Sequence, residues 1–216
     1  MKTIVIIAAL AAFQIGAAQK TVELKDFKSI SVGSDTKVVL VKSSQNKLVI
    51  KGSDDNDLDI QNEGGSLSLN GGDDLDITIY YKDGLENVSA ASDSEVSGKD
   101  EINSKQFSVT AASDAKIVLT VNVKKLLTSA ASDANVTLTG KAVEHDAAIA
   151  SDAELKAEHL ITENTNIVVS SDGAATITAN GIVNATVSSD GSLKIYGKPK
   201  KVNEVKSADA EITVMK

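Results

Sequence analysis

The chain has 216 residues and a formal net charge of −8, from 22 basic and 30 acidic residues. Every basic residue is lysine, so the planar, bidentate group with which proteins grip phosphate is missing, which argues against a nucleic-acid partner. The absence of cysteine excludes disulfides and a lipid anchor on cysteine, and an aromatic content of 3% leaves few rings for stacking on bases or sugars.

The first eighteen residues have the pattern of a secretory signal peptide. Lys2 gives the charged start, residues 4–13 are apolar, and small residues at 16–18 precede an expected cleavage after Ala18. The apolar run is only half of the roughly twenty residues that span a bilayer, so we expect removal rather than a membrane helix. Nothing in residues 19–216 predicts a transmembrane segment, and this length suffices for one domain with a sizeable core.

Residues 19–86 alternate apolar and polar residues without a regular repeat. Ser34-Asp35 has apolar residues three and five positions away, as later repeats do. Asp54 and Asp73 fall at intermediate spacings, but their apolar neighbours lie at even offsets, on the other face of a strand. These neighbours are Leu48, Ile50, Leu67, Leu69 and Ile77. We predict strands of uncertain register, with turns or loops in the polar runs at 53–57 and 71–74.

Residues 87–216 contain one repeat, a Ser-Asp dipeptide that recurs about every nineteen residues. Six dipeptides are spaced by 18 to 21 residues, and Asp209 of Ser207-Ala208-Asp209 continues the series. Their aspartates are Asp93, Asp114, Asp133, Asp152, Asp172 and Asp190. Apolar residues tend to lie three and five positions on either side, which is the alternation of a half-buried strand. The repeats are therefore predicted to consist of β-strands.

A unit of about nineteen residues cannot bury its apolar face alone, so successive units must stack and pair. Parallel pairing of equivalent strands gives a β-helix. We predict an all-β chain: a signal peptide at 1–18, then a single β-helix domain at 19–216, irregular over 19–86 and regular over 87–216. Residues 144–160 could form a helix, but the dipeptide within them keeps the spacing, so we predict another coil.

An up-and-down barrel is the alternative for a chain of many short strands. Its tight hairpins need turn signals such as Asn-Gly, which is rare here and occurs at Asn180-Gly181. The geometry of a barrel also does not require one dipeptide to recur at a regular spacing in the sequence. The β-helix is therefore favoured.

The Ser-Asp dipeptide itself has two interpretations. A strand running straight through it would point serine inward and line the aspartates along one flank, where carboxylates about 4.8 Å apart repel by roughly 0.9 kcal/mol. A divalent cation could relieve that repulsion. The other interpretation is a corner, in which aspartate tolerates turn dihedrals and bonds nearby backbone N–H groups. We favour the corner, because calcium needs about six to eight oxygens and such a ladder offers few per site.

Two further acidic clusters resemble calcium motifs incompletely. The first follows Gly71-Gly72 but occurs once, whereas glycine- and aspartate-rich calcium repeats work in series. The second lacks the glycine and distal glutamate of an EF-hand loop. The clusters are Asp73, Asp74 and Asp76, and Asp54, Asp55, Asp57 and Asp59. We interpret both as solvated loops, with weak divalent cation binding as the alternative, and assign no metal or cofactor site.

No pattern predicts catalysis. His145 and His159 are the only histidines; their separation matches no close pair of metal ligands, so we expect both at the surface. The chain has neither a cysteine nucleophile nor a serine in a Gly-x-Ser-x-Gly elbow. Carboxylate pairs occur in any acidic repeat and single out no glycosidase site. We therefore assign no catalytic residue.

The chain contains a series of short apolar motifs: Phe27-x-x-Ile30-x-Val32, Val38-x-Leu40, Leu48-Val-Ile50, Leu67-x-Leu69, Ile77-Thr-Ile79-Tyr80, and Leu85-Glu-Asn-Val88 running into Ala91-Ser-Asp-Ser-Glu-Val96. Taken together, these motifs resemble the bacterial DUF2807 family, labelled putative auto-transporter adhesin, head GIN domain. The similarity covers nearly all of the mature chain, although Ala-Ser-Asp and Ser-Ser-Asp replace the Ser-Gly and Gly-Asp richer repeats of the family. The resemblance implies a right-handed β-helix, export and no established enzymatic activity, and the family offers no catalytic residues to assign to this chain.

These observations predict an exported, non-enzymatic protein of the periplasm, outer surface or extracellular space, with an adhesin-like role and an unknown protein or glycan as partner. The alternative is a carbohydrate-active enzyme or a cation-dependent glycan-binding protein on the same scaffold. A cleft with convergent Lys, Asp and Tyr side chains would favour the alternative, and uniform faces would favour a binding protein.

Overall fold

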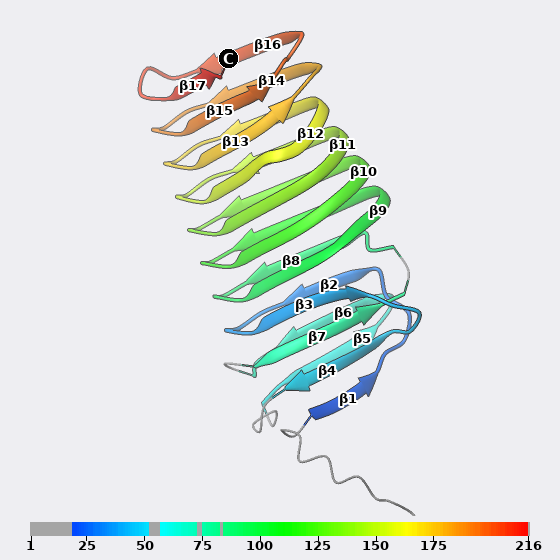
Figure 1. The fold of residues 1–216 in the computed structure, drawn as a ribbon. Coiled ribbons are helices and arrows are strands. Elements are labelled where there is room, and N and C mark those ends of the chain that lie inside the picture. Colours follow the sequence, from blue (N-terminus) through cyan, green and yellow to red (C-terminus); the bar gives the residue numbers. More distant parts are fainter. Residues whose placement is uncertain (1–18, 52–56, 73–74, 83, 216) are drawn as a thin grey trace, which may run out of the picture.

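A computed structural model describes residues 19–51, 57–72, 75–82 and 84–215 of the chain, and these form one 17-stranded sheet wound into a solenoid (Figure 1). The expected signal peptide, Asp54, Asp55, Asp73 and Asp74 lie outside the described residues. The strands are β1 (Gln19–Glu23), β2 (Ser29–Val32), β3 (Lys37–Lys42), β4 (Lys47–Lys51), β5 (Asp59–Glu63), β6 (Ser66–Asn70), β7 (Asp76–Tyr81), β8 (Asn87–Ala91), β9 (Glu95–Ala112), β10 (Lys116–Ala131), β11 (Asn135–Ile149), β12 (Glu154–Val169), β13 (Ala174–Ala179), β14 (Ile182–Val187), β15 (Ser192–Gly197), β16 (Lys201–Lys206) and β17 (Glu211–Val214).

The predicted all-β solenoid is confirmed, with parallel pairing one repeat apart. Val136 of β11, for example, pairs with Ile117 of β10 and with Leu155 of β12. The segment that could have been a helix, 144–160, forms parts of β11 and β12. Among the described residues, none forms a helix of the length and hydrophobicity needed to cross a bilayer.

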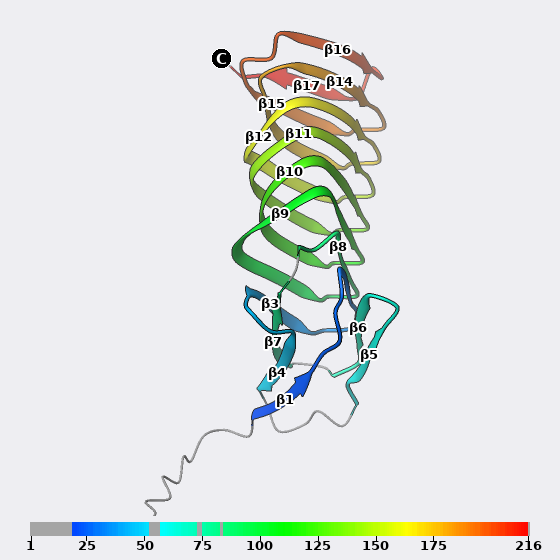
Figure 2. The same cartoon turned by 90° about the vertical axis from the view of Figure 1, so that its right-hand side faces the viewer.

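Each coil of the regular region has two walls that meet at the Ser-Asp dipeptide, and Figure 2 shows the coils as stacked arches. One wall precedes the dipeptide; it contains β8, the C-terminal halves of β9 to β12, β14 and β16, and we call it the ladder wall. The opposite wall contains the N-terminal halves of β9 to β12, β13, β15 and β17. Alternate side chains of both walls point inward and make one continuous apolar core.

The Ser-Asp dipeptides are turns, so the corner interpretation is confirmed. In all six pairs both residues have positive φ, as in Ser132 (54°) and Asp133 (60°), and both are exposed. Two consecutive left-handed residues define a type I′ turn, which is tolerated by few residue types, aspartate among them. The turns stack through their backbones, because the Asp133 N–H donates to the Ser151 carbonyl at 3.0 Å and the other coils repeat this bond.

The straight-strand interpretation, in which serine points inward, is wrong, and one detail of the predicted corner differs from the structure. Serine does not point inward, because the chain reverses instead of continuing as a strand. The inward position belongs to the residue after aspartate, which is small and buried where the walls converge: Ser94, Ala115, Ala134 and Ala153. The turn aspartates bond the neighbouring coil through their backbone N–H groups rather than capping their own turn with the carboxylate.

The N-terminal region stacks out of chain order. Strand β2 pairs in parallel with both β6 and β8, and β3 pairs in parallel with both β7 and β9. The coil made by β2 and β3 therefore lies between the β6–β7 coil and the regular region, as Figure 1 shows. The Ser34-Asp35 coil, about three periods from Asp93 along the sequence, is its neighbour in space.

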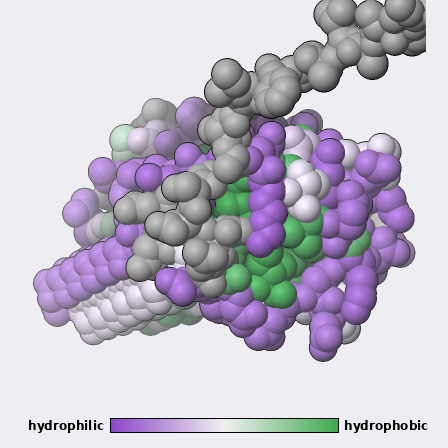
Figure 3. All heavy atoms as spheres, turned by 90° about the horizontal axis from the view of Figure 1, so that it is seen from below, coloured by the Kyte–Doolittle hydropathy of each residue, from purple (hydrophilic) through white to green (hydrophobic). Residues whose placement is uncertain are grey.

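Antiparallel strands cover the N-terminal end of the stack. Strand β5 pairs with β6, while β4 pairs with β7 and β1 pairs with β4. Figure 3, which views this end, shows hydrophobic residues near its centre within a border of polar residues. At the other end, β16 and β17 are each paired with one strand, so the described residues leave one edge of each uncovered.

Candidate functional site

A ladder of amide side chains runs along the outside of the ladder wall. Asp146, Asn166, Asn184 and Asn203 occupy the same position in four successive coils. The Asn166 Nδ2 donates to Asp146 Oδ1 at 2.7 Å, the Asn184 Nδ2 to Asn166 Oδ1 at 2.8 Å, and the Asn203 Nδ2 to Asn184 Oδ1 at 2.8 Å. Parallel pairing places identical positions one above another about 4.8 Å apart, which brings the amides into bonding distance.

The first rung of the ladder is a carboxylate held in its charged form. Lys125 Nζ lies 3.0 Å from Asp146 Oδ2, while Oδ1 accepts the bond from Asn166. The Asn166 bond, followed by Lys125, holds the pKa of the Asp146 carboxyl below its usual value. In return, Asp146 raises the pKa of Lys125. Asp146 is therefore an ionised hydrogen-bond acceptor and not a proton donor.

The ladder borders a shallow groove of about 760 Å³ along the solenoid axis. A second outward column runs beside it, in register across the coils, and is mostly small or apolar: Ser129, Ala148, Val168, Thr186 and Val205. Val168 and Val205 are exposed to 48% and 67%. Among the described residues that line the groove, Asp146 and Glu204 alone are charged, and none is a lysine or a tyrosine. The groove thus offers a row of hydrogen-bonding groups beside an apolar strip.

A buried polar cluster lies behind the groove. His145, next to the first rung, is 1% exposed, and its Nε2 shares a 3.0 Å hydrogen bond with Thr128 Oγ1. Burial lowers the pKa of His145 to about 4, against the opposing effect of Asp146. Thr165 and Thr162 are joined by a 2.7 Å hydrogen bond in the same interior. The expectation that both histidines are exposed is wrong for His145, which takes the inward position held by Leu126 in the adjacent coil, and right for His159.

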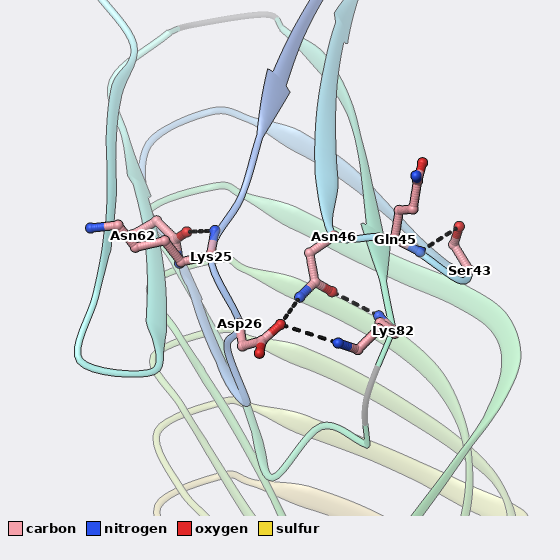
Figure 4. Close-up of polar contacts among 7 residues, drawn as sticks. All are labelled: Lys25, Asp26, Ser43, Gln45, Asn46, Asn62 and Lys82. Atoms are coloured by element: carbon pink, nitrogen blue, oxygen red, sulfur yellow. Dashed lines mark hydrogen bonds and ion pairs between the residues drawn. The ribbon is translucent and has the colours of Figure 1, made fainter.

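A second polar cluster fastens the N-terminal region (Figure 4). Asn46, nearly buried, donates to Asp26 at 2.9 Å and accepts the backbone N–H of Lys82 at 2.8 Å. Lys82 Nζ also lies 3.4 Å from Asp26, and Lys25 N–H donates to Asn62 Oδ1 at 2.5 Å. These bonds join segments far apart in the sequence at the inserted coil. We call Asp26, Asn46 and Lys82 the clasp and assign it a structural role.

A smaller hollow of about 460 Å³ lies on the opposite side. Its floor is apolar, with Val39, Val41 and Val118, and Lys99 and Asp100 also line it. Asp100 accepts the Lys42 backbone N–H at 2.8 Å, and burial, with Asp100, raises the pKa of Tyr81 to about 12. Because Asp100 already accepts a bond from the protein and much of the remaining lining is apolar, we assign this hollow no chemistry.

Those aspartates singled out in the sequence that the structure describes do not converge on a cation site. The turn aspartates are exposed along one edge of the solenoid, and among the described residues no group of three His, Asp or Glu could hold a metal ion. Asp57, Asp59 and Asp76, the described members of the two acidic clusters, lie apart from the groove. The ladder was not predicted from the sequence, although each rung lies six residues before the aspartate of its turn.

Comparisons with known proteins agree with this architecture. Residues 26–199 match the model of the DUF2807 family, described as putative auto-transporter adhesin, head GIN domain. No curated protein matches the chain. A solved structure of a putative adhesin from Bacteroides fragilis NCTC 9343 shares 18% identity and a TM-score of 0.82, covering 94% of this chain and 98% of that one.

Two further solved structures share the fold. A putative adhesin from Parabacteroides merdae ATCC 43184 has 17% identity and a TM-score of 0.75, with 92% of this chain and 96% of that one covered. A putative lipid binding protein from Parabacteroides distasonis ATCC 8503 has 16% identity, a TM-score of 0.70 and the same coverage, 92% and 96%. At these identities the likeness concerns the fold alone.

Proposed function

Because the chain belongs to the family described as putative auto-transporter adhesin, head GIN domain, we propose that it is an exported, non-enzymatic binding protein of the cell envelope or surface. The binding site is the groove of the ladder wall. The observation that carries the proposal is the hydrogen-bonded ladder of Asp146, Asn166, Asn184 and Asn203, a fixed row of outward polar groups on a rigid scaffold. Groups whose positions are set before binding lose little entropy when they bind.

The chemistry of the groove favours binding over hydrolysis. A glycosidase needs a carboxylic acid that is protonated at working pH, which requires a raised pKa. Asp146 has the opposite shift, since Asn166 and Lys125 stabilise its charged form. Amides neither donate protons in acid catalysis nor attack as nucleophiles. A cation-dependent mode receives no support from the described residues, which offer no metal-binding group.

Export is tested by expressing the full chain in a Gram-negative host and sequencing the N-terminus of the protein found outside the cytoplasm. The pattern at 1–18 predicts a mature start at Gln19. Retention of the full-length chain in the cytoplasm would contradict export.

Binding is tested by titrating fluorescent protein 19–216 onto intact bacteria and onto isolated envelope material. We expect saturable binding that falls at least tenfold in the variant Asn184→Ala, since this change interrupts the ladder. Asn135→Ala is the matched control, because Asn135 is an exposed asparagine on the opposite wall. Equal binding by both variants, or release of soluble sugar products, would overturn the proposal.

A further inference from the structure

We infer that the groove binds an extended, uncharged polysaccharide that lies along the solenoid axis, across the strands. This inference rests on the proposed function, because it names the ligand class of the same site. The ladder and the column beside it both run along this axis, one residue per coil, so a ligand following the groove meets one rung and one mostly small or apolar side chain at each coil. The coil spacing, about 4.8 Å, is similar to the length of one sugar in an extended chain.

The unused bonding capacity of the ladder matches hydroxyl groups. An asparagine amide has two N–H donors and two acceptor lone pairs. Asn166 and Asn184 each donate once to one neighbour and accept once from the other, and within the described structure they have no further side-chain partner. Each therefore keeps one donor and one acceptor. A sugar hydroxyl both donates and accepts, so one hydroxyl per rung satisfies both.

The column beside the ladder suits the apolar face of a sugar ring. Ala148, Val168 and Val205 present methyl groups, and the two valines are well exposed. Burying them against ring C–H groups is favourable by about 25 cal/mol per Å² of apolar area. None of the described lining residues is aromatic, so each sugar is held weakly and affinity must accumulate over several coils.

Charge excludes acidic polymers. Among the described residues that line the groove, Asp146 and Glu204 are charged and none is a lysine, and the whole chain carries a net charge of −8. A uronate or sulfated chain would meet like charge at Glu204, with no cation in this lining to compensate it. Lys125, beside the ladder, is already paired with Asp146 at 3.0 Å.

A peptide fits less well than a glycan. Extended peptides bind sheets by adding a strand at an uncovered edge. The floor of the groove is the face of the sheet, where β11 lies between β10 and β12, and β14 between β12 and β16. The backbone groups there are already paired, so a peptide could use only its side chains.

The test is calorimetric titration of protein 19–216 with uncharged oligosaccharides of increasing length, drawn from glucans, mannans and N-acetylglucosamine oligomers. Galacturonate oligomers and an unstructured peptide serve as competing ligand classes. We expect at least one uncharged series to bind, with Kd falling as the oligomer lengthens until it spans the four rungs and then levelling. The Kd should change less than twofold between low and moderate salt.

Three variants localise the binding. Asn184→Ala and Val168→Lys should each weaken the affinity at least tenfold, and Asn135→Ala should leave it unchanged. Val168 is an exposed side chain outside the ladder, so the substitution Val168→Lys should block the groove without disturbing the fold. An unchanged melting temperature of this variant verifies that the fold is intact. Failure of every uncharged series, salt-sensitive binding of galacturonates, or tighter binding of the peptide would overturn the inference. If envelope binding by the groove persists in that case, the proposed function stands with another ligand.

Discussion

The regular region and the N-terminal region build the same coil by opposite routes. Beyond the first coil, which β8 and the start of β9 form, each coil of the regular region stacks on the coil that precedes it in sequence, so Ile117 pairs with Val96 and Val136 about nineteen residues away. In the N-terminal region Val38 pairs with Ile77 and Val96, separated from it by much longer stretches of chain. The regular region can therefore grow one coil at a time, whereas the β2–β3 coil requires partners that are synthesised later.

Deletion of residues 19–51 should have the largest effect on stability. It removes the β2–β3 coil from within the stack and leaves Ile77, Val88 and Val96 without their packing partners. We expect a loss comparable to the whole stability of a domain, more than about 5 kcal/mol, and failure to give a cooperative melt. Deletion of residues 201–216 removes a terminal coil and should lower the melting temperature while preserving the transition. If the two deletion variants had the same melting temperature and the same cooperativity, the β2–β3 coil would be no more important for stability than the terminal coil.

Alanine at Gly140 should be the most damaging single substitution. Gly140 has φ +106°, and a Cβ there would lie 2.1 Å from the Val121 carbonyl oxygen, so the backbone of the adjacent coil must move. We expect a loss of about 2 to 4 kcal/mol in the free energy of unfolding by urea. Gly64, in the N-terminal hairpin, also has positive φ (+58°) but nothing within 4 Å. Gly64→Ala should cost only about 1 kcal/mol, and a larger cost there than at Gly140 would contradict the steric explanation.

The regular region should also lose stability in weak acid through His145. Its pKa is about 4 in the folded protein, against 6.5 for an unperturbed histidine, so the unfolded chain binds the proton first as the pH falls. Protonation of His145 therefore leaves the free energy of unfolding unchanged above pH 6.5. Between pH 6.5 and pH 4 it lowers this free energy by about 3 kcal/mol, and below pH 4 it causes no further loss. Asp146, whose pKa is lowered, contributes its own loss only below its usual pKa of about 4. Urea unfolding at pH 7, 5.5 and 4.5 measures the decline.

The variant His145→Leu isolates this effect. Leucine occupies the equivalent inward position in the adjacent coil, so it should pack without strain. We expect the variant to keep nearly the same stability between pH 7 and 4.5. An unchanged pH profile would assign the decline to other groups.

A smaller effect than those of Gly140 and His145 is predicted for the clasp. Asn46→Ala removes the acceptor of the Lys82 backbone N–H and the donor to Asp26, which should cost about 1 to 2 kcal/mol. Gln45→Ala is the matched control, since the contact of Gln45 is through its backbone N–H and should survive. Faster hydrogen exchange in β3 and β4 of the Asn46 variant, with β10 to β12 unchanged, would locate the loss in the N-terminal region. An equal increase in hydrogen exchange in both regions of the Asn46 variant would show that the two regions open together.

The sequence predicts the structural features that are set by neighbouring residues, and it does not predict those that are set by tertiary pairing. The Ser-Asp pitch identifies the coils because all six Ser-Asp dipeptides of the regular region form the same left-handed turn at the same place in the coil. The position of β2 and β3 is not visible in the spacing, because Ser34-Asp35 has the same flanks whether its neighbours come before or after it in the chain. Its register is set by tertiary pairing with β6 and β8.

The ladder and His145 could have been found by aligning the repeats on the turn aspartate. Six positions earlier lie Asp146, Asn166, Asn184 and Asn203, and seven positions earlier lie Phe107, Leu126 and His145. The first set shares an outward column and the second an inward one, so the burial of His145 follows from Phe107 and Leu126. Residue type alone indicated neither, because histidine is intermediate in burial and an exposed asparagine does not by itself indicate a hydrogen-bonded row.

The single carboxylate of the ladder gives the groove a direction. A carboxylate can only accept hydrogen bonds, so Asp146 obliges Asn166 to turn its N–H toward it, and each later amide follows the same orientation. The three amide dipoles then point the same way, with their positive ends toward the anion, as in a helix whose N-terminus faces a negative charge. The two ends of the groove are electrically different, and a chain molecule whose own ends differ should therefore enter it in one preferred polarity.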